Sequence, residues 1–166
     1  MAGSEQAQQL AERFSQLNDQ VMAFVTPLTD EQWDTICSDD ERPIGIVAHH
    51  VATAHSAIMG WLVTLADGKP LPPLTMEMLD AVNDAHAQRH AGVSKAETLD
   101  LLKRNGDVAA TTLSGFTDEQ LSQTDMVWLL GGATLTTAQL AEAMLLGHAD
   151  EHLQAMRGAL GSPTPG

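Results

Sequence analysis

Apolar side chains recur every three or four residues along almost the whole chain, and this spacing constrains the fold more than any other feature of the sequence. In the first such segment the apolar positions are Leu10, Phe14, Leu17, Val21 and Val25. Apolar residues at this spacing form one face of an amphipathic helix, and no segment alternates convincingly as a half-buried strand would. The sequence therefore predicts an all-α, up-and-down four-helix bundle.

Four helical regions are expected, at residues 4–25, 43–66, 75–113 and 136–160. The proline-rich segment 68–73 must be a loop, because proline breaks a helix and favours extended backbone before it. Gly92 and Val93 are expected to interrupt the third region, because the segment 94–97 (Ser-Lys-Ala-Glu) has the form of a capping box that restarts a helix. We expect a single domain over residues 1–161 and a flexible tail at 162–166.

A short motif, Thr-Asp-Glu-Gln, occurs at residues 29–32 and again at 117–120. Each copy is followed by a polar loop and then by a long helix that carries histidines. The motif is also a common helix-capping pattern, so two explanations remain open, chance and an internal repeat. A repeat would place the second and fourth helices in related positions, facing each other across the core.

The charge of the chain excludes some classes of function. There are 22 acidic residues against 8 lysines and arginines, which gives a formal net charge of −14. Binding to nucleic acid or to an anionic membrane depends on clustered cations, and we expect neither partner. The single cysteine, Cys37, cannot form an internal disulfide and is expected to be incidental. With no recognisable targeting segment, a cytoplasmic location is expected.

Two histidines of the last helix, His148 and His152, are the strongest sign of chemistry. Residues four apart lie about 40° apart around a helix and one turn along it, so both imidazoles can face one point. Neutral imidazole is a good ligand for zinc, nickel, copper and iron. The spacing alone is a weak motif, however, and a metal site needs a third ligand.

The second helix can supply this third ligand. His50 shares its face with Ile46, Val47, Ala54 and Trp61, an apolar stripe that is expected to point inward. His49 lies on a small, polar face and is interpreted as a solvated or rim residue, although it remains the alternative ligand. His55 is interpreted as a core histidine that bonds a backbone carbonyl. His86 and His90 also lie four apart, but their polar neighbours indicate a solvated face.

Together these segments resemble the DinB/YfiT-like family of four-helix metalloproteins. Residues 43–55 are similar to the early histidine motif of that family, with His50-Val51-Ala52 as its best match, and residues 146–152 are similar to its C-terminal His-x-x-x-His. The middle region, with Asn83 ahead of residues 94–99, has a similar layout. The resemblance covers most of residues 5–160.

This resemblance implies a divalent metal ion, zinc or nickel, held by His50, His148 and His152, in a protein that is commonly a homodimer. Relatives include thiol-dependent transferases and isomerases, and other members have been called hydrolases. A small-molecule substrate, and a low-molecular-weight thiol as co-substrate, are therefore expected. Many members have a histidine where this chain has Glu151, which leaves open whether that carboxylate transfers a proton or instead supports the metal ligands from behind. The alternative function is a non-catalytic metal- or small-molecule-binding stress protein.

Overall fold

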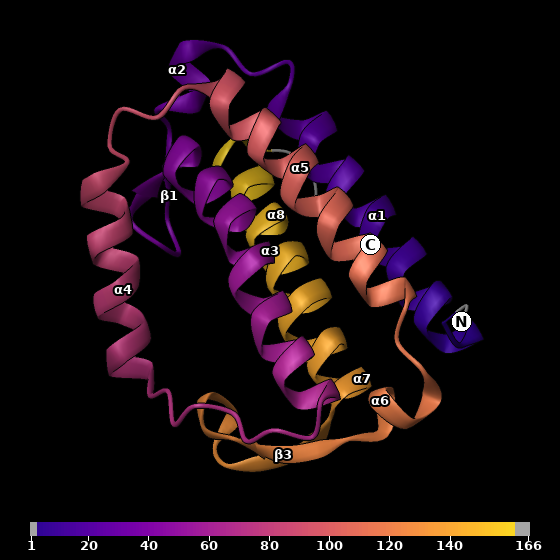
Figure 1. Cartoon of the computed structure of the whole chain (residues 1–166). Helices are drawn as coiled ribbons and strands as arrows, with labels where there is room; N and C mark the ends of the chain where they lie inside the picture. Colours follow the sequence, from indigo (N-terminus) through magenta and orange to yellow (C-terminus); the bar gives the residue numbers. More distant parts are fainter. Residues whose placement is uncertain (1–2, 162–166) are drawn as a thin grey trace.

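The computed structural model describes residues 3–161, and the predicted flexible tail at 162–166 lies outside them. Three long helices and one composite helix form a four-helix bundle (Figure 1), as the sequence predicts. The long helices are α1 (Glu5–Val25), α3 (Ile44–Ala66) and α5 (Lys95–Ser114). The composite helix runs through α7 (Thr137–Leu140), the π-helical segment η2 (Ala141–Leu146) and α8 (Gly147–Ala159).

The order of the helices around the bundle is α1, α5, α3 and α8. At one end of the bundle the backbone N–H of Ser4 donates to Phe116 O at 2.9 Å, and at the other Lys95 Nζ donates to Leu28 O at 2.7 Å. Helices α1 and α5 are therefore antiparallel. In contrast, α3 and α5 run parallel, with Asn105 Nδ2 donating to Ala52 O at 2.8 Å.

The parallel pair is a consequence of α4 (Met76–Arg89), which lies outside the bundle along one side of it (Figure 1). Successive helices alternate in direction along the chain, as the up-and-down prediction requires. One of these passes along the bundle is made by α4, which is not one of its four helices. The chain therefore returns to the end of the bundle where α3 begins before it enters α5. None of the residues of α4, all of which the structure describes, is buried.

Capping boxes begin several helices where the sequence places them. Ser94 accepts from the backbone N–H of Glu97 at the start of α5, and Thr136 accepts from that of Gln139 at the start of α7. The two Thr-Asp-Glu-Gln motifs cap the short helices α2 (Asp30–Trp33) and α6 (Asp118–Ser122). Both motifs thus have the same local role, which accounts for their similarity without a repeat.

Two short antiparallel hairpins depart from the prediction that there are no strands. One pairs β1 (Ile36–Cys37) with β2 (Arg42–Pro43), and the other pairs β3 (Thr124–Val127) with β4 (Ala133–Thr136) around the 3₁₀ turn η1 (Trp128–Leu130). They lie at opposite ends of the bundle (Figure 1). Strands of two to four residues are too short to show alternation in the sequence.

The central helix α3 is the most apolar element. It is long and apolar enough to cross a membrane by length and composition alone, which the sequence analysis did not anticipate. More than half of its most apolar window, 56%, is buried inside the protein. Contacts with α5 on one side and α8 on the other explain this composition, because a helix covered on several faces is apolar around most of its circumference.

A buried polar link ties three helices together in the middle of the bundle. Asn18 of α1 donates through Nδ2 to Leu102 O of α5 at 2.9 Å, and its Oδ1 lies 2.9 Å from Nε2 of His55 in α3. His55 is a fully buried core residue, as predicted, but its partner is this side-chain amide rather than a backbone carbonyl. Gly106 of α5 leaves the space that the amide occupies.

Candidate metal centre

His50, His148 and His152 meet between α3 and α8. Each offers one ring nitrogen, and these three nitrogens all lie within 4.8 Å of one another. Nε2 of His50 and Nε2 of His148 are 3.0 Å apart. Helix α8 provides the His-x-x-x-His pair, and the antiparallel packing of α3 brings the inward-facing His50 opposite it. The structure thus brings these three residues together, and their role as metal ligands stays a prediction.

Burial keeps these imidazoles neutral. It is the largest cause that lowers the pKa of His50 to about 3 and that of His148 to about 2, and repulsion between neighbouring histidines adds to it. The pKa of His152 is lowered too, chiefly by burial, while the negative charges of Asp40 and Glu151 oppose this shift. Neutral rings present lone pairs, which is the form that binds a metal ion.

The π-helical segment η2 directly precedes α8, which carries His148 and His152. The N–H of Gly147 bonds to Glu142 O, five residues back, instead of to the residue four back. A π turn holds more residues than an α turn, so it rotates the residues before it relative to those after it. Short π segments are frequent at functional sites, and this one sets the direction in which the histidines of α8 face.

One cation lies beside the site. Arg42 of β2 bonds to Asp40 at 3.1 Å and to Asp84 of α4 at 2.8 Å, and about a fifth of its side chain (21%) is exposed. Burial is the largest cause of the lowered pKa of His50 and of His152, and the positive charge of Arg42 contributes to the same shift. A partly exposed guanidinium at the edge of the site is suited to bind an anionic group.

Glu151, the candidate proton-transfer residue, is exposed on α8. It lines an open hollow with Ser38, Asp39, Asp150 and Gln154, next to His152 in the chain. Among residues 3–161, no hydrogen bond joins its carboxylate to a histidine of the site, so its role stays a prediction.

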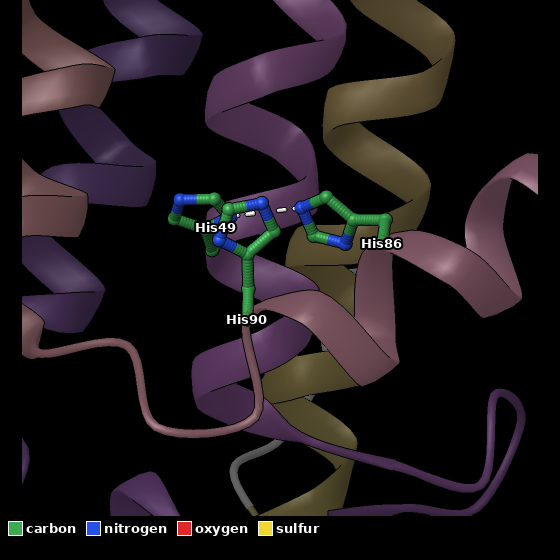
Figure 2. A group of neighbouring side chains, drawn as sticks. All are labelled: His49, His86 and His90. Carbon is green, nitrogen blue, oxygen red and sulfur yellow. Dashed lines mark hydrogen bonds between the residues drawn. The ribbon is translucent and has the colours of Figure 1, made fainter.

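A second group of histidines, His49, His86 and His90, differs from what the sequence predicted (Figure 2). His49 was expected at a solvated rim but is only 3% exposed, and His86 and His90 are half-buried rather than on a solvated face. The reason is tertiary: α4 lies against α3 and covers the small, polar face that carries His49. The second His-x-x-x-His spacing was the one available signal.

The sole cysteine has no catalytic environment. Cys37 lies in β1 and is fully buried, and burial, followed by the charges of Asp40 and Asp39, raises the pKa of its thiol to about 11. A neutral, buried thiol is a poor nucleophile, in agreement with the expectation that this residue is incidental.

The comparisons with known proteins agree with this architecture. The family model of the DinB superfamily matches residues 13–156. The chain belongs to the DinB superfamily. A search of curated proteins finds no significant match. Among solved structures, the chain is similar to YfiT from Bacillus subtilis, reported as a probable metal-dependent hydrolase with an unusual four-helix bundle topology. The TM-score is 0.71 with 16% identity, over 98% of this chain and 92% of that one, so the likeness is one of fold.

The residues of this DinB superfamily member fit a divalent metal ion. Ligands about 2.0–2.1 Å from one ion stand roughly 3 Å apart, which agrees with the 3.0 Å between the Nε2 atoms of His50 and His148. Nδ1 of His148 is buried without a hydrogen-bond partner among residues 3–161. Three uncharged nitrogen donors favour zinc, nickel, copper or iron over magnesium or calcium.

Proposed function

We propose that this chain is a divalent-metal-dependent enzyme that acts on a small molecule, with His50, His148 and His152 as the metal ligands. The observation that carries the proposal is the convergence of three neutral imidazoles from two helices that are far apart in the sequence. Three protein ligands leave an open coordination position, as in catalytic sites rather than structural ones. When bound there, the ion supplies Lewis acidity at that position.

The reaction class that we propose is thiol-dependent transfer or isomerisation, or hydrolysis, with zinc or nickel as the metal. The resemblance of residues 43–55 and 146–152 to family motifs supports the thiol chemistry, and the fold shared with YfiT supports hydrolysis. Arg42 would hold an anionic group of the substrate at the edge of the site. Glu151, exposed beside His152, would exchange a proton between the site and solvent.

The metal site is tested by heating the metal-free, untagged protein with and without added zinc or nickel. A ligand that binds only the folded state raises the melting temperature by mass action. We expect this gain in the wild type and in Glu142→Gln, an exposed control on η2, and a smaller gain or none in the His148→Ala, His152→Ala double variant. Equal stabilisation of all three proteins would place the ion elsewhere.

Catalysis is tested on the zinc- and nickel-loaded proteins with a panel of low-molecular-weight thiols and small electrophiles, and with ester and amide substrates in the absence of thiol. Turnover by the wild type that is lost in the double variant supports the proposal. A protein that binds metal at these residues yet turns over none of the panel would favour the alternative function, a metal- or small-molecule-binding protein without catalysis.

A further inference from the structure

His49, His86 and His90 form a second compact group of ring nitrogens. Their three ligand nitrogens also lie within 4.8 Å of one another. Nδ1 of His49 is 2.8 Å from Nε2 of His86, and the ring centroids of His49 and His90 are 4.3 Å apart. Figure 2 shows the rings facing one another between α3 and the C-terminal end of α4.

We propose that His49, His86 and His90 are a second divalent-metal site, separate from the first, which fastens α4 to the bundle. The site does not depend on the proposed enzymatic function, because it shares no ligand with His50, His148 and His152.

The attachment of α4 is the first argument for this site. None of its residues is buried, and its apolar side chains Met76, Met78 and Val82 are among the exposed large hydrophobics. The helix therefore has little apolar area with which to hold its position, and the hydrophobic effect scales with that area. The histidine group and the ion pair between Arg42 and Asp84 are the polar contacts that join it to the rest of the chain among residues 3–161.

The chemistry of the three rings is the second argument. Nδ1 of His49 and Nε2 of His86 lie 2.8 Å apart, so a proton or a cation must lie between these two nitrogens. Nitrogen donors alone select zinc, nickel or copper, because calcium and magnesium prefer oxygen ligands.

The surroundings leave access for an ion. His49 and His90 line an open hollow with Glu97, Asp100 and Arg104 of α5, so water can complete the coordination. The two triads are neighbours, with ring centroids of His50 and His86 5.7 Å apart. Each triad nevertheless has one ligand from α3 and a His-x-x-x-His pair from another helix, α8 for the first and α4 with its C-cap for the second.

The number of ions bound distinguishes the two sites. Untagged protein is dialysed against zinc buffered at low micromolar free concentration, and bound zinc is measured by mass spectrometry. We expect two equivalents in the wild type, one in the His86→Ala, His90→Ala double variant and one in the His148→Ala, His152→Ala double variant. Gln88→Ala, an exposed control on α4, should keep both ions.

Hydrogen exchange then locates the second ion. Zinc should slow amide exchange across residues 76–89 in the His148→Ala, His152→Ala variant, which retains the second site, and should have no such effect when His86 and His90 are replaced. The substitutions in α4 spare the core, so circular dichroism should show a folded bundle. A single equivalent in the wild type that survives replacement of His86 and His90, or no zinc-dependent protection of residues 76–89, would overturn the proposal. Loss of all zinc from either double variant would also overturn it, because it would indicate one shared site.

Discussion

Replacing Gly106 by alanine should destabilise the bundle, although alanine is the better helix former. A Cβ at this position would lie 2.3 Å from Nδ2 of Asn18, far inside normal contact distance. The amide cannot rotate away without cost, because it donates to Leu102 O and contacts Nε2 of His55. Either α5 moves away from α1 or a buried hydrogen bond is broken.

The magnitude follows from two opposing effects. Overpacking a buried position costs about 1–3 kcal/mol, and a contact this short belongs at the upper end of that range. Alanine in a helix interior is favoured over glycine by about 1 kcal/mol. The net loss for Gly106→Ala is therefore about 2 kcal/mol, which corresponds to roughly 1 M in the urea midpoint for a typical slope of about 2 kcal/mol/M.

Gly60 of α3 provides the matched control, because no described atom other than those of its own stretch of helix lies within 4 Å of a Cβ built there. Gly60→Ala should raise the free energy of unfolding by up to about 1 kcal/mol. Both variants are unfolded in urea and followed by circular dichroism. In an Asn18→Ala background, Gly106→Ala should cost little, because the clashing amide is gone. A Gly106→Ala protein as stable as the wild type, or an unchanged cost in the Asn18→Ala background, would refute the reasoning.

Three other properties of the molecule can be tested in solution. Burial lowers the pKa of His55 from 6.5 to about 4, so the unfolded chain takes up the proton first as pH falls. The folded state therefore loses stability between these two values. In unfolding measurements from pH 7 to pH 4, His55→Gln should remove about 3 kcal/mol of that loss. Gly45→Ala would place a Cβ 2.4 Å from the ring of Trp33, so the free energy of unfolding should fall by about 1–3 kcal/mol and the tryptophan emission should change. We also propose that the protein is a two-fold homodimer without affinity for duplex DNA. Sedimentation at two protein concentrations, with and without a labelled duplex, should show a dimer and a free duplex. A persistent monomer, or a duplex bound at physiological salt, would contradict this proposal.

The sequence by itself determined where the long helices lie and which three histidines converge on α3 and α8. Both follow from local rules. Apolar spacing and capping residues act within a few turns of one helix, so the bounds of α1, α3 and α5 agree with the prediction to within a residue or so. Ile46 and Val47, which share the face of α3 that carries His50, are buried, and an apolar face must point toward the other helices.

The tertiary structure decided what depends on how separate elements meet. Helices α3 and α5 are parallel because α4 runs back along the outside of the bundle between them. A helical wheel assumes a constant angle per residue, so it could not predict the π segment before His148. The second triad was missed because His49 and the pair His86 and His90 each lie on a polar helix face, which a single helix presents to solvent. Only the packing of α4 against α3 covers these polar faces and turns them toward each other, and no local pattern in the sequence specifies that contact.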